Sequence, residues 1–147
     1  MKSKLFIIAG TILLICAIVS GGLYISGASS TARYDKLLNL GNKYLLEGNY
    51  EQAIIAFEKA IKIEPKSVDA RVGLAKAYVA VDRTDDAVAV LEEAIEIDPK
   101  RPEPYISLAE IYIARGELDK AIQILEAGMK NSGDASIAGT VRSQELK

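Results

Sequence analysis

The sequence predicts an all-α fold: three stacked helix–turn–helix units preceded by one apolar N-terminal helix. The first observation is an internal repeat, because EKAIKIEPK starting at Glu58 returns as EEAIEIDPK starting at Glu92, an offset of 34 residues. The second is an uneven distribution of charge. No charged residue lies between Lys4 and Arg33, whereas charges recur every few residues after Arg33. The chain therefore divides into an apolar head and a charged, repetitive body.

The head, residues 1–26, is predicted to be a signal-anchor or transmembrane segment. Leu5 to Ile25 are 21 uncharged residues, enough for a helix that spans a hydrocarbon layer of ~30 Å. Signal peptides usually have an apolar core of only ~7–15 residues. A cleaved signal stays open as an alternative, since Ser20-Gly21-Gly22 could end the apolar helix early. Residues 27–33 are small and polar and are expected to form a flexible linker.

The lysines at the N-terminus set the expected orientation. Lys2 and Lys4 precede the apolar segment, and positive residues favour the cytoplasmic side. We therefore expect a single-pass membrane protein that contacts the membrane through residues 5–25, with the repeat domain outside the cytoplasm.

The body, residues 34–133, is predicted to consist of three repeats over 34–67, 68–101 and 102–133. Each repeat reads as two amphipathic helices, because apolar residues recur at helical spacing on both sides of a central break. Glu47-Gly48-Asn49 forms the break in the first repeat. The offset of 34 residues aligns positions of similar size: Leu40, Leu74 and Leu108; Tyr44, Tyr78 and Tyr112; Ala53, Ala87 and Ala121; Phe57, Leu91 and Leu125.

The sizes of these residues have a packing reason. Small residues are expected where two helices approach closely, and large residues such as Tyr44 and Phe57 are expected to fill the space between repeats. One hairpin cannot bury its apolar face alone, so three must stack. Residues 134–147 form a tail in which Ile137 and Val141 lie one helical turn apart, which favours a short capping helix. If the tail does not cap, another subunit is expected to cover the last repeat.

The composition argues against several classes of function. After Arg33 the chain has 15 basic and 20 acidic residues, a net charge of −5, so it lacks the basic stripe that nucleic acid binding needs. The chain has one cysteine, Cys16, and no histidine. We therefore expect no metal site, no cofactor and no enzyme activity. The acid pairs Asp85-Asp86 and Glu92-Glu93 are expected to lie on solvated helix faces.

The repeated unit resembles the tetratricopeptide repeat, whose 34-residue pattern places Leu-Gly and Tyr in the first helix, Ala, Phe and Ala in the second, and then Pro. The first repeat matches this pattern in register at Leu40, Gly41, Tyr44, Ala53, Phe57, Ala60 and Pro65. The third repeat departs from it, since Gly133 stands in place of the final proline. The resemblance implies a right-handed α-solenoid whose first helices line a concave groove for a peptide or partner protein.

The groove positions of that family, carried onto this chain, form three rows that we expect to bind the peptide: Leu38, Val72 and Ile106; Asn42, Lys76 and Glu110; Leu45, Val79 and Ile113. Two apolar rows beside a polar one suit an apolar or amphipathic segment. The alternative for the aliphatic rows is packing between neighbouring first helices. An acidic chaperone tail is not expected, because Glu110 would repel its carboxylates.

The function predicted from the sequence is therefore a membrane-tethered adaptor that binds a partner protein or peptide. Two alternatives remain open at this stage. One is a structural subunit of an envelope complex that self-associates as a homo-oligomer, and the other is a secreted repeat protein with a cleaved signal.

Overall fold

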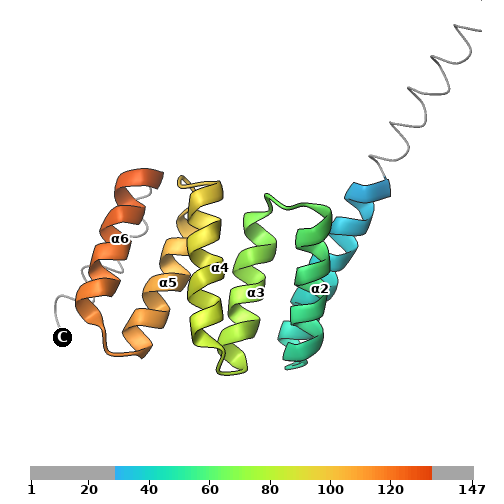
Figure 1. Ribbon diagram of the computed structural model, residues 1–147, viewed down its shortest axis with the longest axis horizontal. Coiled ribbons are helices and arrows are strands. Elements are labelled where there is room, and N and C mark those ends of the chain that lie inside the picture. Colours follow the sequence, from blue (N-terminus) through green and yellow to red (C-terminus); the bar gives the residue numbers. More distant parts are fainter. Residues whose placement is uncertain (1–28, 134–147) are drawn as a thin grey trace, which may run out of the picture.

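The protein is described by a computed structural model, which places residues 29–133. A first helix over residues 29–46 is followed by five helices: α2 (Tyr50–Ile63), α3 (Val68–Ala80), α4 (Thr84–Ile97), α5 (Pro102–Ala114) and α6 (Leu118–Ser132). The helices follow one another along the long axis of the molecule in chain order (Figure 1). The prediction of an all-α solenoid of three helical hairpins is thereby confirmed for the described residues.

The turn inside each hairpin repeats with the same hydrogen bonds. The amide N–H groups of Asn49, Arg83 and Glu117 donate to the carbonyls of Tyr44, Tyr78 and Tyr112, each at 2.9 Å. This bond belongs to a helix ending in which one residue adopts the left-handed conformation, usually glycine. Gly48 and Gly116 have φ of +75°, but the second turn uses Asp82 with φ of +61°. Each hairpin turn therefore requires one residue in the left-handed backbone conformation, and the second turn meets this requirement with Asp82 in place of a glycine.

The helices α2 and α3 start in different ways. Ser67 caps α3, because its hydroxyl oxygen accepts a hydrogen bond of 3.0 Å from the amide of Ala70. The side chain of Asn49 makes no such bond to α2; its amide instead donates to the carboxylate of Glu47 at 3.2 Å. The preceding turn, rather than a side-chain cap, therefore sets the start of α2.

The core lies between the first and second helices of successive hairpins. Phe57, Leu91 and Leu125 are fully buried at equivalent positions. The ring of Phe57 fits only because two glycines face it: a Cβ added to Gly41 would lie 2.6 Å from its Cε1, and one added to Gly73 would lie 2.5 Å from the same atom. Small residues were expected where two helices approach closely, and Gly41 and Gly73 both stand at such an approach.

A buried arginine joins the second hairpin internally. Arg71 stands where Leu37 and Tyr105 stand in the other repeats, and only 10% of its side chain is exposed. Its Nη1 donates to the carbonyl of Pro65 at 2.7 Å, and its Nε donates to Glu93 at 3.2 Å. Since these acceptors lie on the loop before α3 and on α4, Arg71 ties the start of one helix to the end of the next.

The structure corrects the expected localisation as a single-pass membrane protein. Among residues 29–133, no helix is both long enough and apolar enough to cross a membrane. The helices α2 to α6 have 13 to 15 residues, against the roughly 20 that a span needs. The helix over 29–46 carries Arg33, Asp35, Lys36 and Lys43. The head, 1–26, and the tail, 134–147, lie outside the described residues.

The part of the predicted linker that the structure describes, residues 29–33, is helical. Residues 29–33 were expected to be flexible together with 27 and 28, but they form the beginning of the first helix. Ser29, Ser30 and Thr31 are small, and none of them is Gly or Pro, so nothing in these residues stops a helix that the apolar face after Tyr34 anchors.

Candidate functional site

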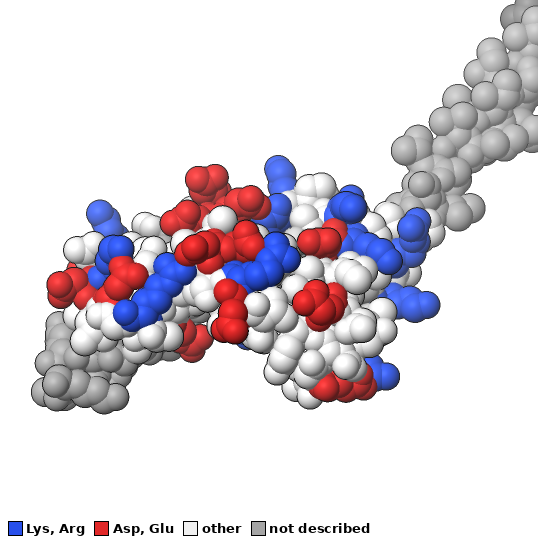
Figure 2. All heavy atoms as spheres, turned by 60° about the horizontal axis from the view of Figure 1, so that its bottom comes forward, with Lys and Arg blue, Asp and Glu red and all other residues white. Residues whose placement is uncertain are grey.

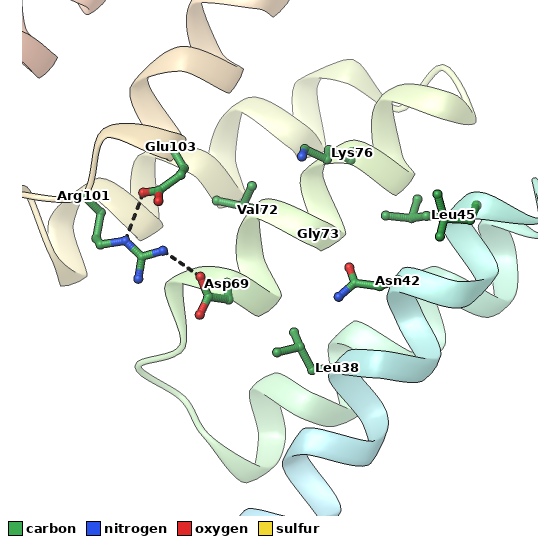
Figure 3. A pocket seen from close by; sticks show the side chains of 10 residues that line it. Leu38, Asn42, Leu45, Asp69, Val72, Gly73, Lys76, Arg101 and Glu103 are labelled. Atoms are coloured by element: carbon green, nitrogen blue, oxygen red, sulfur yellow. Dashed lines mark hydrogen bonds and ion pairs between the residues drawn. The ribbon is translucent and has the colours of Figure 1, made fainter. Parts of the chain in front are cut away.

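The first helices of two hairpins enclose a hollow of about 700 Å³ on the inner side of the solenoid. Leu38, Asn42 and Leu45 project into it from the helix over 29–46, and Val72 and Lys76 project from α3 (Figure 3). These are five of the nine residues predicted to line a groove. Helical spacing explains the arrangement, because residues four and seven apart share one face of a helix. The wall is mainly aliphatic, with two polar side chains at its centre.

An ion-pair network closes one end of this hollow. The guanidinium of Arg101 donates to Asp69 at 2.7 Å and to Glu103 at 2.9 Å (Figure 3). The hydrogen bonds that Arg101 donates to Glu103 and, second in size, to Asp69 raise the pKa of Arg101 above its usual value. Two cations are among the described residues that line this hollow, Arg101 and Lys76. Arg101 is neutralised by two carboxylates, whereas Lys76 forms no ion pair with a described residue.

A second hollow of about 440 Å³ continues along the same side, between α3 and α5. Lys76 lines both hollows, and Val79 and Glu110 line the second. At the far rim, the guanidinium of Arg115 donates to Asp85 at 2.5 Å. Seven of the nine predicted residues therefore border one continuous inner surface, which we call the concave groove.

The other two predicted residues lie elsewhere. Ile106 and Ile113 border neither hollow and are partly buried against a cluster formed by Ala109, Ala121 and Leu125. This cluster belongs to α5 and α6, so these contacts lie inside the third hairpin and are not the packing between neighbouring first helices that the alternative expected. The groove in the described structure therefore centres on the first two hairpins and their junction with α5.

Two lining residues escaped the sequence prediction. Leu46 is 91% exposed and borders the first hollow, but its counterparts at the 34-residue offset are Ala80 and Ala114, so no row of large residues marked it. Arg101 lies one residue before α5, outside the helical face from which the rows were taken. The signal that could have pointed to Arg101 is the pair of acids Asp69 and Glu103, which lie in the first turns of α3 and α5 and form ion pairs with it.

The acid pairs Asp85-Asp86 and Glu92-Glu93 were expected to lie on solvated helix faces. Asp85, Asp86, Glu92 and Glu93 are exposed, and no group of three or more potential metal ligands occurs in the described part of the chain. The groove offers an aliphatic wall, one unpaired ammonium and amide or carboxylate groups, which suit contact with a polypeptide.

A family model described as tetratricopeptide repeat matches residues 44–92 and 79–144. The chain belongs to the tetratricopeptide repeat family. No curated protein matches the sequence. The tetratricopeptide fold is that of a protein-interaction scaffold, and its hairpin pattern accounts for the repeated turns and small residues described above.

Solved tetratricopeptide structures share the fold at low sequence identity. The first such domain of Spaghetti (RPAP3), solved with an HSP90 peptide, is 19% identical with a TM-score of 0.67, covering 78% of this chain and 92% of that one. A domain of yeast Sti1 in a complex with Hsp70 is 23% identical with a TM-score of 0.68 and the same coverage. The translocator chaperone SycD of Yersinia enterocolitica is 21% identical with a TM-score of 0.69, covering 77% and 92%.

Proposed function

We propose that this protein is a protein-interaction adaptor that binds an apolar or amphipathic segment of a partner in its concave groove. The nine residues predicted from the repeat pattern include seven that border this groove, and we assign the contact to those seven together with Leu46. We also propose that the repeats run over 34–67, 68–101 and 102–133, since α3 and α5 begin at Val68 and Pro102.

The observation that carries the proposal is the exposure of large aliphatic side chains inside the groove. Leu46 is 91% exposed and Val79 is 42% exposed, and they border the first and second hollows. Burying apolar surface contributes about 25 cal/mol per Å², so a partner that covers both side chains gains free energy from contacts that the unbound protein leaves in water.

The titles of two similar structures support a peptide as the ligand, because the RPAP3 domain is bound to an HSP90 peptide and the Sti1 domain is in a complex with Hsp70. The groove of this chain favours a different peptide chemistry from an acidic tail. Leu38 and Val72 supply apolar wall, Arg101 is neutralised by two carboxylates, and Glu110 adds negative charge to the second hollow. An apolar segment with at most one acid, facing Lys76, fits these groups.

The proposal is tested with peptides selected on the full chain from a random library. Affinities of the selected peptides are then measured by isothermal titration for the wild type and for Leu46→Asp and Val79→Asp. Both side chains are exposed, so these substitutions leave the unfolding free energy within about 0.5 kcal/mol. We expect apolar sequences to be enriched and each substitution to weaken binding at least about tenfold.

The matched control is Leu118→Asp, which makes the same change at a side chain 41% exposed on α6, away from the groove. It should leave peptide affinity unchanged. Selected peptides that bind Leu46→Asp and Val79→Asp as tightly as the wild type would refute the groove assignment.

A further inference from the structure

The N-terminal end of the solenoid carries a second exposed surface, distinct from the concave groove. Between the helix over 29–46 and α2 lies an apolar strip, formed by Leu37, Leu40, Tyr44 and Ile55 around a hollow of about 150 Å³. Ile55 is 50% exposed. A wider hollow of about 590 Å³ adjoins it through Leu37 and Lys59. We call the two hollows together the end face.

Four cations surround the wider hollow: Arg33, Lys36, Lys59 and Lys62. Among residues 29–133 no acidic residue lines it, and none of the four forms an ion pair with a described carboxylate. The arginines near the groove and the hairpin joints behave differently, since Arg71, Arg101 and Arg115 are each paired with an acid. Lys and Arg side chains gather at this end of the molecule, whereas Asp and Glu gather over its middle (Figure 2).

The repeat itself shows what covers such a face. Counting 34 positions on from Leu37, Leu40, Tyr44, Ala56 and Lys59, which all line the first hollow, gives Arg71, Leu74, Tyr78, Val90 and Glu93, and these line the corresponding hollow of the second hairpin. There the helix α2 of the preceding hairpin lies over them, through Glu58, Ile61 and Lys62. The hydroxyl of Tyr78 donates to Glu58 at 3.3 Å. The natural occupant of this kind of surface is therefore an amphipathic helix.

The two faces differ in the sign of the charge at one position. In the internal joint, Lys62 of the covering helix borders the same hollow as Glu93. On the end face the position of Glu93 is taken by Lys59, so a helix seated in the same way meets a cation where α2 meets an acid. Like charges across an interface are unfavourable and opposite charges favour it. The geometry points to an acidic amphipathic helix of a partner protein, and we propose that the end face is its docking site.

Three other occupants fit less well. The first 34 residues of this chain contain no Asp or Glu, and residues 134–147 contain two acids and two bases, so neither segment supplies the negative charge. A second copy could offer α6, but this helix carries Asp119 and Glu126 against Lys120 and Lys130. A small polyanion satisfies the cations but leaves the apolar strip exposed.

The chain supplies a suitable probe for the experiment. The peptide 84–97, which forms α4, has five acids and no base, and its buried residues are all apolar; in the fold α4 contacts both α3 and α5. Fluorescein-labelled peptide is titrated with the full chain and followed by fluorescence anisotropy. A control peptide has Asn for Asp and Gln for Glu. We expect saturable binding of the acidic peptide, and binding at least about tenfold weaker for the neutral one.

Variants of the chain locate the site. Lys36→Glu with Lys59→Glu should weaken binding at least about tenfold, and Ile55→Ser should weaken it several-fold. The matched control, Lys100→Glu with Lys130→Glu, makes the same change of net charge at exposed lysines elsewhere and should have no effect. Because Leu46→Asp and Val79→Asp alter only the concave groove, they should leave this binding intact, which keeps the test separate from that of the proposed function.

Four results would overturn the proposal. The first is absence of saturable binding at concentrations of the chain up to ~1 mM. The second is equal weakening by both pairs of lysine substitutions, which would show an effect of net charge alone. The third is displacement of the peptide by tripolyphosphate together with no effect of Ile55→Ser, which would indicate a simple polyanion site. The fourth is self-association in sedimentation that Lys59→Glu abolishes, which would make a second copy the occupant.

Discussion

The packing of Phe57 gives a prediction whose sign depends on one neighbouring residue. A Cβ added at Gly73 would lie 2.5 Å from both Cε1 and Cζ of the ring, and Phe57 is fully buried. The other hairpins show the opposite solution, because the equivalents of Phe57, Gly41 and Gly73 one repeat later are Leu91, Ala75 and Ser107. A smaller central residue thus accompanies larger neighbours.

The magnitude follows from two opposing effects. Overfilling a packed core costs about 1–3 kcal/mol, whereas replacing glycine by alanine inside a helix stabilises it by about 1 kcal/mol. Gly73→Ala should therefore lower the free energy of unfolding by about 1 kcal/mol when residue 57 is Phe. In a Phe57→Leu background the clash is relieved, and the same change should raise it by about 1 kcal/mol.

The assay is urea unfolding followed by circular dichroism at a helical wavelength, on the four proteins of the double-mutant cycle. The predicted coupling between the two positions is about 2 kcal/mol. If Gly73→Ala instead stabilises both backgrounds equally, the Cβ does not meet the ring, and the described packing of α3 against Phe57 is wrong.

Three further predictions concern the turns and the arginines. Asp82→Gly should stabilise the protein by about 0.5–1 kcal/mol in urea unfolding, because Asp82 holds a left-handed φ of +61° that glycine adopts without strain; a loss of stability would contradict this. Arg71→Ala should lower the free energy of unfolding by about 2–4 kcal/mol, since it removes a buried guanidinium that donates to the carbonyl of Pro65. A smaller effect would show that this hydrogen bond is dispensable. Arg101→Ala should cost less than about 1 kcal/mol, because its partners Asp69 and Glu103 are about half exposed; thermal unfolding compares the two arginine variants directly.

The repeat architecture could be predicted because it depends on periodic side-chain size. Tyr44 and Phe57 recur as similar residues at a fixed offset, and local helix propensity agrees with that pattern. The predicted groove residues came from the resemblance to the tetratricopeptide repeat, and three of them, Leu38, Asn42 and Val72, border the first hollow.

Features that depend on contacts between repeats were not predictable. Arg101 reaches Asp69 from another hairpin, and that contact exists only after stacking. Ile106 obeys the same row rule as Leu38, but it borders neither hollow and packs against the cluster around Leu125. The localisation rested on the apolar composition of residues 5–25, and the helices that the structure describes do not include a membrane-crossing one.

The most direct test of the central claim is chemical-shift mapping of a library-selected peptide on the isotopically labelled full chain. We predict that the largest perturbations fall on the helix over 29–46 and on α3, at Asn42, Leu46 and Lys76, and extend to Glu110 on α5. Perturbations confined to the outer helices α2, α4 and α6 would contradict the proposal that the concave groove holds the partner.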